Sequence, residues 1–174
     1  NNKTMKKVTI ILTGVILMSI ASLSVKAQNT ASVPEAQASA TVIKPINIEN
    51  PVILNFGNLI SSSTAGTIVL DVNGQRNASA GVTLPTAIPG NVSAAQFNVS
   101  GENNAHYALS ISESVNLENS SSNIMVLNNF QHNATRILSG TGVETFNVGG
   151  TLNVLAGQAS GLYEGTYTVT VTYE

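Results

Sequence analysis

The sequence predicts an all-β fold, an antiparallel sandwich of short strands, and three observations support this prediction. Short runs rich in Val, Ile, Thr, Phe and Tyr alternate with Gly, Asn and Ser, with spacings of roughly 8 to 15 residues that are typical of a sandwich or barrel. No stretch places apolar residues at helical spacing with capping residues at both ends. The chain also closes with a run of strict two-residue alternation, 166–173.

The first 27 residues have the pattern of a secretory signal peptide. A basic region begins at Met5, and a mostly apolar run from Val8 to Val25 follows it. Val25 and Ala27 then supply small residues at the two positions that signal peptidase requires. A membrane anchor is the alternative, but it needs about 20 apolar residues, and polar residues interrupt this run. We therefore expect secretion through the periplasm to the cell surface, and no membrane span in the mature chain.

The mature part, 28–174, is acidic and contains no cysteine. It keeps three of the seven basic residues and all nine acidic ones, which gives a formal net charge of −6 with neutral histidines. Such a charge repels phosphate backbones, so nucleic acid is not an expected partner. Small secreted domains often rely on disulfides. This domain must instead be stabilised by burial and strand pairing alone.

The predicted organisation is a flexible N-terminal arm, 28–39, followed by a single sandwich domain, 40–174. Small and polar residues dominate the arm. The strands predicted in the domain are the β-prone runs bounded by turn residues: Ala40–Ile48, Val52–Phe56, Thr67–Val72, Val82–Leu84, Gln96–Ser100, His106–Ile111, Ile124–His132, Thr145–Val148, Thr151–Leu155 and Thr166–Tyr173.

Two connections are predicted to be tight turns, because Asn and Gly tolerate positive φ. Asn73-Gly74 follows one predicted strand, and Gly149-Gly150 joins two others. The stretch that begins at Asp71 also resembles the opening of a calcium loop. The twelfth position of that loop is occupied by Val82 in place of the bidentate glutamate, so the hairpin is preferred.

The last predicted strand has the clearest pattern in the chain. Tyr167, Val169, Val171 and Tyr173 fall on one face, and threonines occupy the other. A slip of one residue would exchange the two faces, so the alternation fixes the register of this strand. We expect the apolar face to contribute to the core.

No catalytic, cofactor-binding or metal-binding residues are predicted. The chain contains no G-x-S-x-G nucleophile motif. His106 and His132 are its only histidines, and they have neither cysteine partners nor the spacing of a zinc site. The sequence therefore predicts a protein that is not an enzyme and that needs no cofactor.

The C-terminal third resembles a family of secreted bacterial proteins known only as a domain of unknown function. Residues 149–158 read GGTLNVLAGQ and residues 161–173 read GLYEGTYTVTVTY. Members of that family commonly end in G-x-Y-x-G-x-Y-x-V-x-V-x-Y. Residues 40–46 and 54–57 are similar to the opening strands of the same family.

The ending is also similar to that of chaperone–usher pilins and spore-coat-U-like subunits. In those proteins a glycine fourteen residues from the end and a penultimate tyrosine frame the last strand. Gly161 and Tyr173 occupy these positions here. The resemblance implies an immunoglobulin-like, pilin-like sandwich completed by a donated strand, which comes first from a periplasmic chaperone and then from the arm of the next subunit. The residues implied for the assembly strand are Gly161, Tyr167, Val169, Val171 and Tyr173.

The arm of this chain is a possible donor. Its larger or alternating apolar residues are Val33, Ala36, Ala38, Ala40 and Val42. About a dozen extended residues reach about 40 Å, which is enough to cross a neighbouring sandwich. The side chains are small, however, so their volume predicts weak anchoring.

These observations predict a non-catalytic exported subunit, of the cell surface or of a pilus-like fibre, that assembles through edge-strand pairing. Its expected partners are further copies of itself or sister subunits, and a periplasmic chaperone. The alternative is a monomeric secreted sandwich that binds a carbohydrate or a protein through its loops. Few aromatic residues fall in predicted loops, which counts against a sugar-binding platform.

Overall fold

The computed structural model describes residues 31–32 and 35–174, which fall into two units, 1–40 and 41–174. In the first unit the described residues are exposed and form no strand. The predicted signal peptide, 1–27, and Val33 of the predicted donor arm lie outside the described residues. The second unit contains all the strands.

Residues 41–174 form an all-β, antiparallel sandwich, which confirms the predicted fold class. No helix occurs in the described part of the chain. The strands are β1 (Asn47–Val52), β2 (Asn55–Phe56), β3 (Ile60–Ser61), β4 (Gly66–Leu70), β5 (Arg76–Ala78), β6 (Val82–Thr83), β7 (Val92–Ser93), β8 (Ala95–Ser100), β9 (Tyr107–Ile111), β10 (Ser114–Glu118), β11 (Ile124–His132), β12 (Val143–Val154) and β13 (Val169–Tyr173).

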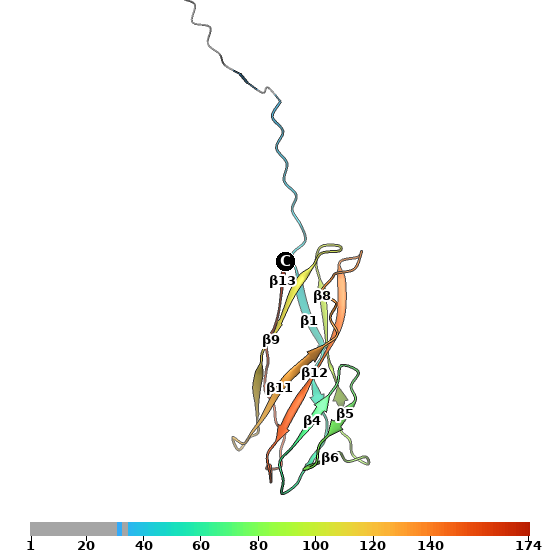
Figure 1. Cartoon of the computed structure of the whole chain (residues 1–174), viewed down its shortest axis with the longest axis vertical. Helices are drawn as coiled ribbons and strands as arrows, with labels where there is room; N and C mark the ends of the chain where they lie inside the picture. The colour runs from blue at the N-terminus through green and yellow to red at the C-terminus, as the bar shows by residue number, and fades with distance from the viewer. Residues whose placement is uncertain (1–30, 33–34) are drawn as a thin grey trace, which may run out of the picture. The chain divides into compact units, whose positions relative to one another are not determined.

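The larger sheet has the order β1-β8-β12-β11-β10, with β4 also paired to β12 and β5 paired to β4. β9 and β13 pair with each other in a second sheet, and β2–β7 and β3–β6 form two short pairs. In Figure 1, β11 and β12 run diagonally through the domain, and β4, β5 and β6 lie at the end away from the C-terminus. β1 and β13 are therefore the edge strands of two different sheets.

The long strand β12 joins the two ends of the larger sheet. Its first half pairs with β8, where Phe146 lies opposite Phe97. Its second half pairs with β4, where Leu152 lies opposite Ile68. Alternating side chains along β12 enter the interior, so this one strand contributes to the core along its whole length.

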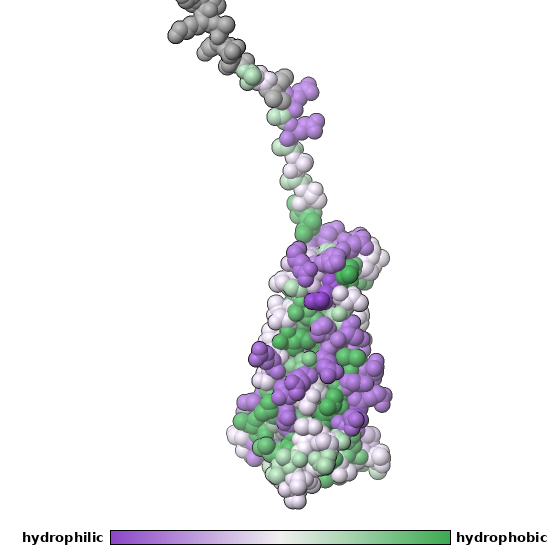
Figure 2. Space-filling view, viewed as in Figure 1, coloured by the Kyte–Doolittle hydropathy of each residue, from purple (hydrophilic) through white to green (hydrophobic). Residues whose placement is uncertain are grey.

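The interior consists of two hydrophobic clusters. One gathers around β4, β11 and the end of β12, and the other around β8, β9 and the start of β12. Leu54 and Phe130 pack against both clusters. On the face drawn in Figure 2, hydrophilic side chains are densest near the end that carries the C-terminus, and hydrophobic ones lie in small groups between them. This distribution is expected when strands turn their apolar side chains inward.

The predicted Asn73-Gly74 hairpin is confirmed. β4 and β5 pair antiparallel across it, and Gly74 has a φ of 79°. The Asp71 carboxylate accepts hydrogen bonds from the backbone N–H of Asn73 (2.9 Å) and of Gln75 (2.8 Å). The bond from Gln75 is the main cause that lowers the pKa of Asp71 below its usual value. The carboxylate therefore organises a turn.

The predicted turn at Gly149-Gly150 is wrong, because β12 continues through both glycines and neither takes a positive φ. A Cβ atom on Gly149 would collide with the carbonyl oxygen of Leu70. Gly149 therefore allows β4 to lie close to β12, whereas the space at Gly150 faces Leu127 of β11.

The boundaries of the first and last predicted strands also change. The strand predicted at Ala40–Ile48 begins only at Asn47, since residues 40–46 have no ladder partner. The strand predicted at Thr166–Tyr173 is regular only from Val169. The prediction omitted β10 altogether, although Val115 and Leu117 alternate with polar residues there.

Candidate functional site

A groove of about 1230 Å³ lies between two segments, one near the beginning of the domain's sequence and one near its end. One wall is formed by residues of 48–61, which include β1, β2 and β3. The other wall is formed by residues 158–169, which lead into β13. Because β1 and β13 are edge strands of two sheets, the groove is the open side of the sandwich.

The floor of this groove is the hydrophobic core itself. Met125, Leu127 and Leu152 belong to the first cluster, and Phe97 belongs to the second. Leu117, from β10, joins them in the lining. The groove thus crosses both clusters at a place where no strand of the described structure covers them.

The backbone along one wall of the groove is paired on one edge only. Ser112 N–H donates to the carbonyl of Thr168 (3.0 Å), and Glu174 N–H donates to the carbonyl of His106 (3.3 Å). Bonded and non-bonded pairs alternate along an antiparallel ladder. The N–H and C=O groups of Tyr167 and Val169 therefore point to the opposite edge, where no strand of the described residues is paired with them.

A clasp closes the groove at the end where the C-terminal strand finishes. The Tyr173 hydroxyl donates to the carbonyl of Lys44 (2.8 Å) and accepts from the N–H of Glu102 (2.6 Å). Lys44 N–H in turn donates to the Glu102 carboxylate (2.9 Å). A Cβ on Gly101 would collide with the tyrosine hydroxyl, so glycine makes room for this contact. The penultimate tyrosine therefore ties the last strand to the segment that precedes β1.

Gly161 lies in the groove wall beside the turn between β10 and β11. Its φ of 150° belongs to a region that side chains rarely adopt, and a Cβ there would approach the Asn119 amide at 3.2 Å. Asn119 is buried and organises this turn, since its Oδ1 accepts from the N–H groups of Ser121 (3.0 Å) and Asn123 (2.9 Å). Glycine thus allows the C-terminal segment to lie close to β10.

Tyr167 lies in the lining of the groove and contributes its ring to the core. The ring stacks on Phe130 at a centroid distance of 4.8 Å and meets Phe97 edge-on at 6.4 Å. Its hydroxyl is buried, and no hydrogen-bond partner exists for it among the described residues. Burial raises the pKa of Tyr167 to about 12. At neutral pH the hydroxyl is therefore a protonated donor without an acceptor.

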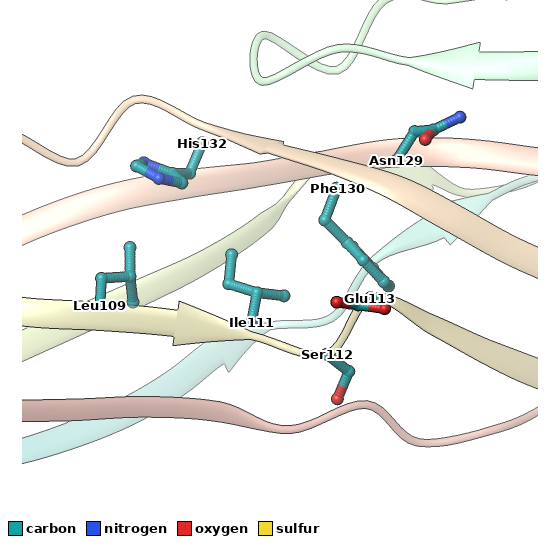
Figure 3. A pocket seen from close by; sticks show the side chains of 7 residues that line it. All are labelled: Leu109, Ile111, Ser112, Glu113, Asn129, Phe130 and His132. Atoms are coloured by element: carbon teal, nitrogen blue, oxygen red, sulfur yellow. The ribbon is translucent and has the colours of Figure 1, made fainter.

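A second, smaller hollow of about 360 Å³ lies between β9 and β11. Figure 3 shows Leu109 and Ile111 rising from β9, with Phe130 pointing down toward them from β11. Two of its polar groups have structural partners: the Ser112 hydroxyl accepts from Thr168 N–H (3.0 Å), and His132 Nδ1 accepts from Ala134 N–H (3.2 Å). The hollow therefore has an apolar floor and no nucleophile–base pair within hydrogen-bond reach.

The structure separates the residues predicted for the assembly strand into different surroundings. Gly161, Tyr167 and Val169 line the groove, Val171 is buried in the second cluster, and Tyr173 forms the clasp.

The residues predicted for the donor arm are not in a strand. Ala36, Ala38 and Ala40 are exposed, and Val42 is 97% exposed. The wall 48–61 was not predicted as part of any site. No signal in the sequence marks it, because isoleucine normally lies in the core and only the structure shows that Ile53 and Ile60 are 65% and 54% exposed.

Within residues 31–32 and 35–174, no group of three or more His, Cys, Asp or Glu side chains is placed to hold a metal ion. Nor does that part of the chain contain a helix long and apolar enough to cross a membrane.

The sequence pattern of a family described as "Domain of unknown function (DUF4402)" matches residues 46–173. The match begins one residue before β1 and ends with β13, so it covers the sandwich and both walls of the groove. Neither a curated protein nor a solved structure matches the chain.

Proposed function

Because the chain belongs to this family of domains of unknown function, we infer its role from the groove. We propose that it is an exported, non-catalytic structural subunit of the cell surface or of a pilus-like fibre. It assembles by accepting an extended segment of another polypeptide into the groove. In this proposal the domain is an immunoglobulin-like sandwich that lacks one strand, and the incoming segment supplies it.

The observation that carries the proposal is the coincidence of an unpaired strand edge and an uncovered core. The edge at Tyr167 and Val169 offers backbone donors and acceptors, and the floor beside it offers apolar side chains from both clusters. An added β-strand satisfies both at once, since its backbone completes the ladder and its alternate side chains fill the floor. Exposed edges are otherwise an aggregation hazard.

Two sequence features support export and a structural role. The first 27 residues have the pattern of a cleavable leader, which would take the domain through the periplasm to the surface. The sequence also contains no G-x-S-x-G nucleophile motif, which is why the proposal assigns the chain a structural role.

The alternative is a monomeric secreted sandwich that binds a carbohydrate or a protein through its loops. Sugar-binding sites usually present exposed aromatic rings. In this domain Phe56, Phe97, Phe146 and Tyr107 are buried. No structural feature favours this alternative over the groove.

The test is a charge placed on the groove wall. Leu162 lines the groove and is 74% exposed, so Leu162→Arg should leave the fold intact. A long charged side chain beside the apolar floor should obstruct the incoming strand and weaken its insertion about tenfold or more, which corresponds to about 1.4 kcal/mol. Oligomers and fibres from cells that export the full chain can be quantified by native mass spectrometry and electron microscopy.

The matched control is Leu155→Arg. Leu155 is 61% exposed and does not line the groove, so this variant should assemble like the parent protein. Equal assembly of the parent protein and both variants would contradict the proposal. So would an exported protein that remains monomeric in its native host.

A further inference from the structure

We propose that the segment which fills the groove comes from a different protein and not from the N-terminal arm of another copy of this chain. It carries large apolar side chains at alternate positions and a basic residue beside Glu164. This inference rests on the proposed function, which makes the groove a strand acceptor. It concerns the identity of the strand that is accepted.

The first argument is volume. The groove measures about 1230 Å³ and crosses both hydrophobic clusters, so its occupant must fill space above several large side chains. On one parity the arm offers Ala36, Ala38, Ala40 and Val42. The six side-chain carbons of these residues fill on the order of 200 Å³, if each takes about the 30 Å³ of a water molecule. An occupant that small would leave voids and forfeit dispersion contacts.

The other parity of the arm is less suitable. Between Val33 and Ile43 it places Glu35, Gln37, Ser39 and Thr41 toward the floor. A carboxylate and an amide above Met125 would lose their water without gaining partners from this apolar surface. Neither parity of the arm of this chain therefore matches the groove.

The second argument is the type of molecule. A free fatty acid or another lipid would cover the apolar floor, but it has no ladder of donors and acceptors for the edge at Tyr167 and Val169. A polypeptide strand supplies carbonyl groups at regular intervals along the same edge. The groove therefore favours an extended peptide.

The third argument is charge. Glu49 and Glu164 are the charged residues that line the groove, and no lysine or arginine joins them. Glu164 lies directly opposite Glu118, with backbone bonds of 2.8 and 3.1 Å between the two residues. Like charges directly across a ladder are destabilising. A basic side chain on the incoming strand would relieve this repulsion, whereas the arm brings another acid, Glu35.

Arg76, the arginine nearest to the groove wall, does not serve this purpose. Its guanidinium Nη1 donates to the carbonyls of Phe56 (2.7 Å) and Asn58 (2.9 Å), which holds that part of the wall in place. The cation therefore has to come with the occupant.

The test compares three synthetic peptides against the protein secreted by cells that express the full chain. The first peptide has the sequence of residues 28–43. The second is a designed peptide of equal length with Leu, Val and Phe at alternate positions and one lysine. The third replaces that lysine with glutamate. Affinity is measured by fluorescence anisotropy, and stabilisation by the shift in Tm.

We expect the designed lysine peptide to bind at least about tenfold more tightly than the arm peptide, and to raise the Tm further. The glutamate peptide should bind several-fold more weakly than its lysine counterpart. Leu162→Arg should reduce the affinity for the lysine peptide, whereas Leu155→Arg should not.

The other outcomes separate the two proposals. If the arm peptide binds as tightly as the designed peptide, the inference of a foreign strand is overturned and the strand acceptor remains. If no peptide binds, both are overturned. If dodecanoate displaces the designed peptide and stabilises the protein more than any peptide does, the occupant is a lipid and the strand acceptor fails.

Discussion

The two halves of the C-terminal segment differ in their surroundings, although the alternating run 166–173 extends across the boundary between them. In the second half, Val169–Tyr173 form a regular ladder with β9, Val171 is buried, and Tyr173 is held by the clasp. In the first half, residues 158–168 touch the sheet at isolated points such as Glu164 and form one wall of a groove. Alternation therefore specifies which face turns inward, but not whether a strand lies on each side.

This difference also assigns separate roles to Gly161 and Tyr173, the two residues on which the resemblance to pilin endings rests. Tyr173 acts within the domain, because its hydroxyl joins the last strand to Lys44 and Glu102. Gly161 shapes the groove wall next to Asn119. The closed half stabilises the domain, and the open half is the half that we propose to be functional.

The largest expected effect is in the closed half. Val171 is 9% exposed within the second cluster, so Val171→Asp would bury a charge without a partner. An uncompensated buried charge costs about 3–5 kcal/mol, which is a large part of the stability of a domain. Thr170→Asp, on the exposed face of the same strand, is the matched control. Urea denaturation followed by circular dichroism measures both, and similar midpoints for the two variants would contradict the inward register of β13.

A smaller effect is expected at the clasp. Tyr173→Phe removes the hydroxyl and leaves the carbonyl of Lys44 and the N–H of Glu102 without it. The loss should be about 1–3 kcal/mol in the free energy of unfolding, at the lower end if water replaces the hydroxyl. Hydrogen exchange should also increase in the β13 amides. An unchanged unfolding midpoint and unchanged exchange would show that the clasp does not hold the last strand.

The sequence was sufficient for elements whose pattern is local. Ile124–His132 has the predicted bounds because a run of apolar residues next to turn-forming Asn residues defines it without reference to any distant neighbour. The Asn73-Gly74 turn is equally local, since positive φ is a property of the residue itself.

The errors concern features that depend on neighbours distant in the sequence. A glycine at position 149 is compatible in sequence with a turn and with a strand that needs room for the carbonyl oxygen of Leu70. Only the position of β4 in the fold distinguishes these two roles. The groove could not be predicted for the same reason. Ile53 and Leu162 resemble core residues in sequence, and their exposure follows from the absence of a strand between two segments that are about a hundred residues apart.

The smallest expected effect on stability comes from a substitution in the open half, and it compares the open half directly with the closed half. Tyr167→Phe removes a buried hydroxyl that has no partner among the described residues, so the unfolding free energy at neutral pH should stay the same or rise by about 1 kcal/mol. Tyr173→Phe, the same chemical change six residues away, should destabilise. Equal losses in both variants would contradict the difference between the two halves.

The same variant should change the response to alkali. Burial raises the pKa of Tyr167 from 10.0 to about 12, so the folded state holds this proton more tightly than the unfolded state does. That contribution to stability is complete below pH 10 and is lost as the pH rises toward 12. Tyr167→Phe should therefore lose less stability than the parent protein across this range. A residual slope should remain from Tyr107, whose pKa is also raised by burial and by its hydrogen bond to Glu144. Identical slopes for parent and variant would mean that the hydroxyl of Tyr167 is not buried in solution.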